Sequence, residues 1–105
     1  ESGPDVPPCP RCGGLLRPDV VLFGESLPFA ALEAAFEAAR TCDAFFSIGT
    51  SGLVQPAASL AYAARSKGAL VVEINAEPTP LSEKVDFFFQ GKSGEVLPAL
   101  VKAIW

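Results

Sequence analysis

The sequence predicts an α/β fold in which helices flank a parallel sheet. Short, almost continuously apolar segments at 19–23, 43–48, 69–74 and 84–90 alternate with segments whose apolar residues recur at helical spacing. Strands of this kind are typical of parallel sheets that are covered on both faces. The chain has 105 residues, of which 50% are hydrophobic, and this is enough for one small domain with a packed core.

The N-terminal elements are predicted from the positions of proline, glycine and cysteine. Residues 1–8 are polar and rich in proline, so we expect an irregular lead-in. Residues 9–14 (CPRCGG) predict a tight knuckle, because the two glycines allow the backbone to turn until both cysteine sulfurs point to one centre. The run DVVLF at 19–23 predicts a short buried strand that ends at Gly24.

Helices and strands are predicted to alternate over the rest of the chain. Pro28 suits the start of a helix, and in the segment that follows it Phe29, Leu32 and Phe36 would share one face. The remaining predicted elements are a strand over 43–48, a helix from the VQPAA run to Gly68, strands over 69–74 and 84–90, and a terminal helix over 94–104.

Small and polar residues follow the predicted strands, where parallel sheets bind their ligands. Gly49-Thr50-Ser51-Gly52 follows the second strand. Its small residues would let a ligand approach the backbone, and its hydroxyls and amides would favour an anion. The alternative is a simple helix cap made by Thr50 or Ser51. The dinucleotide fingerprint Gly-x-Gly-x-x-Gly is absent from the sequence.

Comparable residues follow the later strands. Asn75 and Glu77 could hold ribose hydroxyls, as polar side chains do in dinucleotide-binding folds, or Asn75 could simply form a turn before Pro78. A third glycine-rich turn lies at 91–94. The placement of these turns at successive strand ends favours nucleotide binding more than any one of them does.

Cys9 and Cys12 have the spacing of half a tetrahedral zinc site. The alternative is a thioredoxin-like redox pair, but Gly13 and Gly14 disfavour the helix that such a pair would begin. The third cysteine, Cys42, precedes a strand and is predicted to be a small buried apolar residue. A four-cysteine zinc site therefore cannot be completed by this sequence alone.

The composition disfavours several classes of partner. The net charge of -4 disfavours nucleic acid and anionic membrane surfaces. No apolar run approaches the roughly 20 residues that cross a bilayer, and no signal-peptide pattern is present. Three cysteines, an odd number, fit a reducing compartment, so we expect a cytoplasmic protein with no nucleic-acid or membrane partner. The sequence contains no histidine, the commonest general base.

Four motifs occur in a fixed order along the chain: CP-x-CGG-x-LRPDVV-x-FGE-x-LP, D-x-x-x-x-IGTS-x-x-V-x-PAA, INAEPT and G-x-x-GEVLP. In this combination the chain resembles the second half of a sirtuin, an NAD-dependent protein-lysine deacylase, from Cys9 to its end. GTSG followed by VQPAA is similar to bacterial and archaeal enzymes of the deacetylase/desuccinylase branch.

The resemblance implies an incomplete zinc module followed by part of a Rossmann-like sheet. Cys9 and Cys12 would be the second of two Cys-x-x-Cys pairs that hold a structural Zn²⁺, and the first pair would lie upstream. Residues 1–18 would form the second half of this zinc-ribbon module. Residues 19–105 would form the C-terminal, distal half of a Rossmann-like NAD-binding domain, so the chain would be a C-terminal portion of the enzyme.

The resemblance also implies residues for the two substrates. Near the phosphates, riboses and adenine of NAD would lie Gly49, Thr50, Ser51, Asn75, Ala76, Glu77 and Ser93. Against the acylated lysine and its peptide would lie Val21, Phe23, Gly24, Glu25, Leu53 and Val54.

The implied activity is the NAD-dependent removal of acetyl groups, with succinyl groups as a further option, from lysines of acylated proteins or peptides. The products would be nicotinamide and O-acyl-ADP-ribose. The catalytic histidine would lie upstream of this chain, so the chain alone is expected to be inactive. The alternative is a non-catalytic nucleotide-binding regulatory module with a zinc knuckle.

Overall fold

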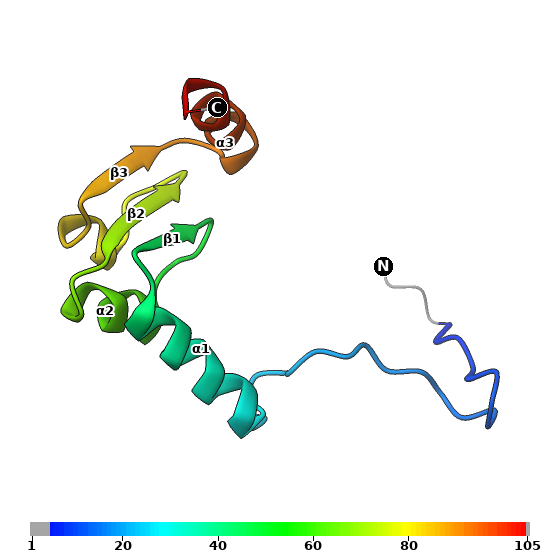
Figure 1. Cartoon of the computed structure of the whole chain (residues 1–105). Helices are drawn as coiled ribbons and strands as arrows, with labels where there is room; N and C mark the ends of the chain where they lie inside the picture. The colour runs from blue at the N-terminus through cyan, green and yellow to red at the C-terminus, as the bar shows by residue number, and fades with distance from the viewer. Residues whose placement is uncertain (1–4, 105) are drawn as a thin grey trace.

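A computed structural model describes residues 5–104, so residues 1–4 of the expected lead-in and Trp105 lie outside the described residues. Figure 1 shows an α/β unit (residues 29–104) from which an arm (residues 5–28) projects. The elements of the α/β unit are α1 (Phe29–Thr41), β1 (Ala44–Ile48), α2 (Ala58–Ser66), β2 (Leu70–Asn75), the 3₁₀ helix η1 (Pro80–Glu83), β3 (Phe87–Gln90) and α3 (Ser93–Ile104).

The three strands form a parallel sheet in the order β1-β2-β3, which confirms the predicted fold class. In this register Ile48 of β1 lies beside Ile74 of β2, and Asn75 of β2 lies beside Gln90 of β3. Figure 1 shows the three arrowheads on the same side of the sheet. The turns that follow the strands are therefore neighbours, as a ligand site at this edge requires.

Helices lie against both faces of the sheet. Helix α2 packs on β1 and β2, α1 packs on α2, and α3 packs on β2. Because side chains alternate along a strand, Phe45 faces the α1–α2 side, while Phe46 lies with Val72 against α3. Helix α3 contributes apolar side chains such as Leu97 to this second contact.

The best-buried segment of the molecule is the central strand. Residues 71–74 of β2 are all buried, and Val71 and Ile74 have no exposed surface. A second group of small residues, Ala39, Ala64 and Ala69, joins α1 and α2 to the start of the sheet. Small side chains let the two helices approach closely, so the sheet and its flanking helices form one packed unit.

The strand predicted at 19–23 is wrong. In the structure residues 19–25 form bends, turns and irregular chain, and Val20, Val21, Leu22 and Phe23 are exposed. A strand exists only where a neighbouring strand takes up its backbone hydrogen bonds. No strand lies beside residues 19–23 within the part of the chain that the structure describes.

Two predicted boundaries also moved. Helix α2 begins at Ala58, the last residue of the VQPAA run, rather than at its start, because the residue before Pro56 is disfavoured in a helix. Strand β3 begins at Phe87 rather than near Lys84, because η1 occupies residues 80–83 and ends with the Lys84 N–H donating to the Leu81 carbonyl. Phe29 was expected on the packed face of α1 but is 73% exposed, and Leu32 and Phe36 are half-buried.

Within residues 5–104 we find no helix with the length and apolar character needed to cross a membrane.

Candidate functional site

The candidate site is the edge of the sheet where β1, β2 and β3 end. Three turns meet there: Gly49–Gly52 after β1, Asn75–Glu77 after β2, and Gly91–Ser93 after β3. Residues 49–51 and 76–77 are exposed, while Asn75 and Ser93 are half-buried. These seven residues are the ones expected from the sequence to contact NAD, and the parallel sheet places them at one edge.

The turn after β1 has a backbone that only glycine adopts easily. Gly49 has φ +66° and Gly52 has φ +70°, in the left-handed region. Between them the side chains bond locally, since Thr50 Oγ1 accepts from the Gly52 N–H (3.2 Å) and Ser51 Oγ accepts from the Leu53 N–H (3.2 Å). Helix α2 begins only at Ala58. The hydroxyls therefore shape this turn, and the structure does not support the alternative of a direct helix cap.

Asn75 joins the turns after β1 and β2. Its Nδ2 donates to the Thr50 carbonyl (2.8 Å), and its Oδ1 accepts from the Ala76 N–H (3.1 Å). The Gly49 N–H donates to the Ile74 carbonyl (2.9 Å), so a backbone bond supports the same junction. The alternative of a turn-forming Asn75 is thus partly correct, because one amide group shapes its own turn and also fixes its neighbour.

The turn after β3 is held to the same junction. The Gly91 N–H donates to the Asn75 carbonyl (2.8 Å), and Gln90 Nε2 donates to the Ala76 carbonyl (3.3 Å). A Cβ at Gly91 would lie 2.9 Å from Val96 Cγ2, which leaves no room for a side chain. Ser93 follows as the first residue of α3, so the positive end of this helix faces the same edge.

A hollow of about 210 Å³ opens beside the turn after β1. Thr50 and Gly52 form part of its wall, and Leu81 of η1 faces them. The rest of the lining comes from β1 and the start of α2, mainly as apolar side chains. The site thus combines polar turns with an apolar recess, which is the usual composition of a small-molecule site.

The arm forms a second, separate group of predicted substrate residues. A tight turn is closed by Glu25, whose Oε1 accepts from the Leu22 N–H (2.7 Å) and from the Arg17 guanidinium (2.8 Å). These two donors, the Leu22 N–H first, lower the pKa of Glu25 and keep it a carboxylate. Gly24 takes φ +89°, and the Phe23 side chain at the tip is 92% exposed.

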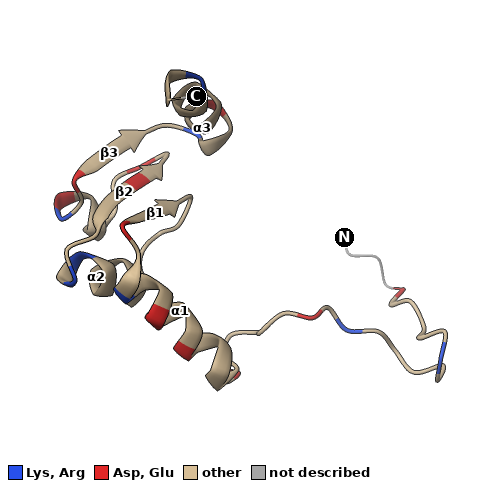
Figure 2. Cartoon of the chain, in the orientation of Figure 1, with Lys and Arg blue, Asp and Glu red and all other residues tan. Residues whose placement is uncertain are grey.

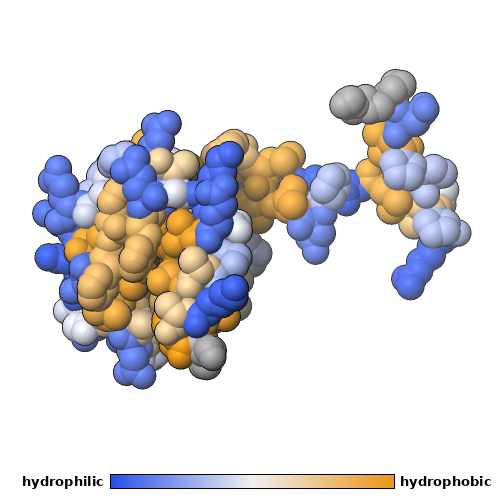
Figure 3. All heavy atoms as spheres, turned by 90° about the horizontal axis from the view of Figure 1, so that it is seen from above, coloured by the Kyte–Doolittle hydropathy of each residue, from blue (hydrophilic) through white to orange (hydrophobic). Residues whose placement is uncertain are grey.

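The structure does not bring the predicted peptide-binding residues together. Leu53 and Val54 lie just after the turn that follows β1 and are exposed. Val21, Phe23, Gly24 and Glu25 lie on the arm, which Figures 1 and 3 show extending away from the sheet. Figure 3 also shows hydrophobic residues gathered on one face of the α/β unit and along the arm. Both groups of residues are exposed and could contact a ligand. They do not line a common cleft in this structure.

The knuckle at Cys9 forms as predicted. Pro8 and Leu15 pair in an antiparallel bridge, and the Cys9 N–H donates to the Gly14 carbonyl (2.6 Å). Cys9 Sγ accepts from the Arg11 N–H (3.4 Å), and Cys12 Sγ accepts from the Gly14 N–H (3.4 Å). Hydrogen bonds from the Cys12 and Arg11 backbone, and then from the Cys12 side chain, lower the pKa of the Cys9 thiol.

This knuckle suits a metal ligand pair but does not complete a site. N–H groups aimed at sulfur favour the thiolate, which is the form that binds zinc. Among residues 5–104 no group of three or more His, Cys, Asp or Glu side chains could hold a metal ion. The knuckle brings together two cysteines, fewer than the four ligands of a structural zinc site.

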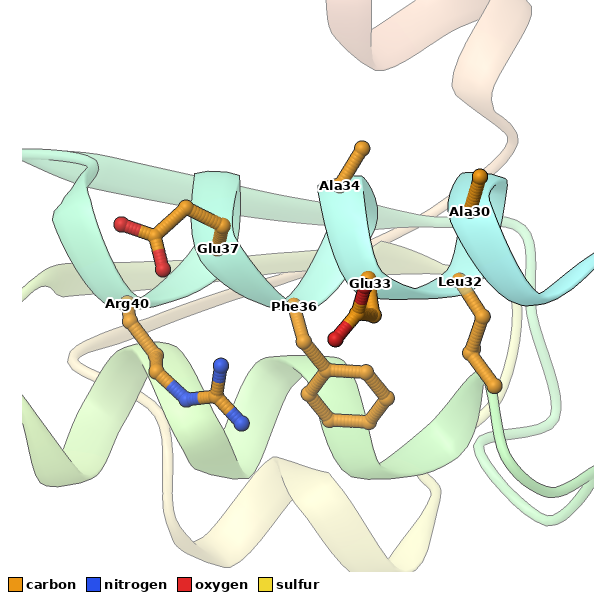
Figure 4. Close-up of a pocket in the computed structure, with 7 residues that line it drawn as sticks. All are labelled: Ala30, Leu32, Glu33, Ala34, Phe36, Glu37 and Arg40. Carbon is orange, nitrogen blue, oxygen red and sulfur yellow. The ribbon is translucent and has the colours of Figure 1, made fainter.

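A further hollow, on α1, has no feature of a site. Figure 4 shows that its labelled lining residues, from Ala30 to Arg40, all belong to this one helix. The Arg40 guanidinium lies 5.4 Å from the centre of the Phe36 ring, and the acidic residues Glu33 and Glu37 lie nearby. Figure 2 shows the positive residues spread over the arm and the helices rather than gathered at this place.

One buried acidic residue was not singled out by reasoning from the sequence. Glu73 of β2 is 1% exposed, and its carboxylate accepts from the hydroxyls of Thr79 and Ser82. An acidic residue inside the apolar run VVEI was the available signal, because a buried carboxylate requires specific partners.

Comparison with known proteins gives a consistent match. Residues 2–56 match the Sir2 family. The chain is 52% identical over 100 residues to an NAD-dependent protein deacylase of Pyrococcus furiosus, covering 95% of this chain and 40% of that protein. It is 54% identical over 101 residues to NAD-dependent protein deacylase 2 of Pyrobaculum aerophilum, covering 95% and 41%.

Solved structures show the same similarity. A Sir2 homologue in complex with NAD superposes with a TM-score of 0.84 at 44% identity, over 96% of this chain and 40% of that one. Sir2Af2 bound to a myristoylated histone peptide gives a TM-score of 0.82 at 47% identity, over 92% and 42%. The chain thus spans about two fifths of the length of the relatives that it matches.

Proposed function

Because the chain belongs to the Sir2 family, we propose that it forms the nucleotide-binding edge of an NAD-dependent protein-lysine deacylase. The observation that carries the proposal is the junction at Asn75, which fixes three turns at the carboxyl edge of a parallel sheet. The relatives named as NAD-dependent protein deacylases are more than twice as long as this chain. We therefore propose that the activity belongs to a longer protein that contains it.

At this edge the chain would bind NAD as a co-substrate. Gly49, Thr50 and Ser51 present backbone and hydroxyl groups to the phosphates and the nearby ribose. Asn75, Ala76 and Glu77 hold the adenosine ribose, and Ser93 lies against the adenine. The support for this arrangement is the exposure of these polar groups beside a recess and the positive end of α3.

NAD supplies the ribose carbon to which the acyl oxygen of the lysine bonds as nicotinamide leaves. The residues of this chain orient the dinucleotide and shield its ribose, which is catalysis by positioning. The sequence contains no histidine, so the base that accepts the proton would come from another part of the longer protein.

The acylated peptide would bind between two segments of this chain. Val21 and Phe23 line the acyl-lysine path, and Gly24 and Glu25 present backbone groups to the peptide. Leu53 and Val54 contact its other edge. Exposed backbone and apolar side chains at both segments suit the addition of an extended peptide as a strand. The arm would have to lie closer to the sheet than Figure 1 shows.

Cys9 and Cys12 would hold a structural Zn²⁺ together with two cysteines from outside this chain. The bound ion would supply folding free energy and no acid–base chemistry, since four protein ligands leave no open position. The support is the tight knuckle with its N–H groups aimed at sulfur.

The test of the function is an assay of the longer protein with NAD and an acetyl-lysine or succinyl-lysine peptide. We expect nicotinamide and O-acyl-ADP-ribose to form in equal amounts with the deacylated peptide. Binding of NAD without turnover of any acyl peptide would instead support a non-catalytic nucleotide-binding module.

Substitutions at the junction should weaken NAD binding. In the longer protein we expect Ser51→Ala to raise the dissociation constant of NAD about 2- to 12-fold, the value of one hydrogen bond. Asn75→Ala should have the larger effect, because it also removes the bond to the Thr50 carbonyl. Titration calorimetry measures both constants.

Ser66→Ala is the matched control, because its hydroxyl bonds only within α2, to the Ala63 carbonyl. Unchanged NAD constants in both site variants, with the control also unchanged, would show that the dinucleotide does not bind at this edge.

A further inference from the structure

Glu73 is a buried acid that the proposed reaction does not use. It lies in β2 between Ser47 of β1 and Phe88 of β3, and only 1% of its surface is exposed. A buried carboxylate costs free energy unless hydrogen bonds compensate for its lost hydration. Oε2 accepts from the Thr79 hydroxyl and Oε1 from the Ser82 hydroxyl, so each carboxylate oxygen has its own donor.

The two hydroxyls that donate to Glu73 also accept from the backbone. Thr79 Oγ1 accepts from the Leu81 N–H (3.2 Å), and Ser82 Oγ accepts from the Thr79 N–H (2.8 Å). These bonds form the capping box of η1. Both hydroxyls donate to the carboxylate, so the conformation of residues 79–82 depends on Glu73.

Residues 79–82 in turn support the turn after β1. The Thr79 side chain lies near Gly52, since a Cβ added at Gly52 would be in ordinary van der Waals contact with it, 3.7 Å from Thr79 Oγ1. Leu81 is 3% exposed and faces Thr50 and Gly52 across the recess. Asn75 is two residues after Glu73 and so lies on the same face of the strand, where it holds the Thr50 carbonyl.

We propose that Glu73 is a positioning residue for NAD binding, acting through Thr79 and Ser82 on the walls of the nucleotide site. It fixes the segment that begins at Asn75 and returns through η1, and thereby the position of the turn at Gly52. The inference rests on the proposed binding of NAD at this edge. In this proposal the carboxylate of Glu73 sets the geometry of the NAD-binding edge without touching the dinucleotide.

The donor pattern explains why a neutral analogue should not replace this carboxylate. A carboxylate only accepts hydrogen bonds, whereas the amide of Gln offers one acceptor and one donor group. In Glu73→Gln, the NH₂ group would replace one carboxylate oxygen and face a hydroxyl that already accepts from a backbone N–H. The proton of that hydroxyl would lose the oxygen that accepts it. In Glu73→Asp the charge remains, but the side chain is one methylene shorter and cannot reach both hydroxyls.

The experiment compares Glu73→Gln and Glu73→Asp with Glu83→Gln in the longer protein. Glu83 is an exposed acid of η1, so its substitution removes the same charge without touching the cluster. The readouts are the dissociation constant of ADP-ribose by calorimetry, the KM values for NAD and for the acyl peptide, and the melting temperature. All constants are measured at a temperature at which each variant is folded.

We expect Glu73→Gln to raise the ADP-ribose constant and the KM for NAD about five- to tenfold, the effect of displacing one or two polar contacts. The KM for the peptide should rise less than the KM for NAD, because only Leu53 and Val54 of the proposed peptide contacts adjoin this turn and the others lie on the arm. Glu83→Gln should resemble the unsubstituted protein. A structural role alone would lower the melting temperature without separating the two KM values.

Two results would overturn the inference: unchanged ADP-ribose and NAD constants in folded Glu73→Gln, or an equal rise in both KM values. If the unsubstituted protein binds ADP-ribose but deacylates nothing, the proposed reaction fails, and the ADP-ribose constants still test the role of Glu73. If the unsubstituted protein does not bind ADP-ribose, both proposals fail.

Discussion

The chain of 105 residues, assayed alone with NAD and an acetyl-lysine peptide, is expected to release no nicotinamide above the rate in buffer. General acid–base help contributes about 10²- to 10⁴-fold to a rate, and this sequence contains no histidine to supply it. Incomplete positioning of the dinucleotide lowers the rate further, since the reacting groups are no longer held together.

Glu25 is the acidic candidate that could replace the missing base, and the structure argues against it. Its pKa is lowered by the Leu22 N–H and the Arg17 guanidinium, so it is a weaker proton acceptor than an ordinary glutamate. It also lies on the arm, away from the turns that would hold the ribose.

The measurement is nicotinamide release from equal concentrations of the chain and of the longer protein. The peptide without its acyl group gives the background rate for each. Turnover by the chain at the rate of the longer protein would contradict the proposed division of roles, because it would require a base among the residues described here.

The second large effect is expected at the knuckle. In the longer protein, Cys12→Ser should abolish the binding of zinc, which we expect at one ion per chain. A structural zinc contributes about 10–16 kcal/mol of apparent binding free energy in small zinc modules at neutral pH. Loss of one of four thiolates should therefore unfold the module, and the melting temperature should fall together with the metal content.

The matched control is Cys42→Ala, which also removes one thiol. Cys42 is half-buried and donates only to the Ala39 carbonyl (3.3 Å), so its loss should leave the zinc content unchanged. Elemental analysis of the purified proteins gives the stoichiometry. A longer protein that contains no zinc, or a Cys12→Ser variant that keeps its zinc, would contradict this role of the knuckle.

The sheet could be predicted because its strands are locally distinctive. The runs DAFFSI and ALVVEI are short, apolar and bounded by turn residues, and both became strands within one residue of the expected bounds. The run DVVLF at 19–23 has the same character and did not. A strand requires a neighbouring strand, and the residues of one run do not indicate whether such a neighbour is present.

The candidate site could be predicted for the same reason and within the same limit. The carboxyl ends of parallel strands lie at one edge, so the turns at 49–52 and 75–77 were expected at the same edge once the sheet was predicted. That they are direct neighbours follows from the observed strand order. The hydrogen bond from Asn75 to Thr50 and the partners of Glu73 depend on the path of the chain between strands. Local spacing carries little information about that path.

The central position of β2 has a consequence for how the protein opens. Strand β2 has a partner on each side and four consecutive buried residues, whereas β1 and β3 each have one partner in the described sheet. Amide hydrogens of β2 should therefore exchange with solvent most slowly, since they are freed only when both neighbours separate. Asn75 extends from this slowest-exchanging strand, while the turns after β1 and β3 belong to strands that open more readily. At the proposed NAD-binding edge, the turn after β2 would then stay fixed, while the turns after β1 and β3 could adjust to a ligand without global unfolding.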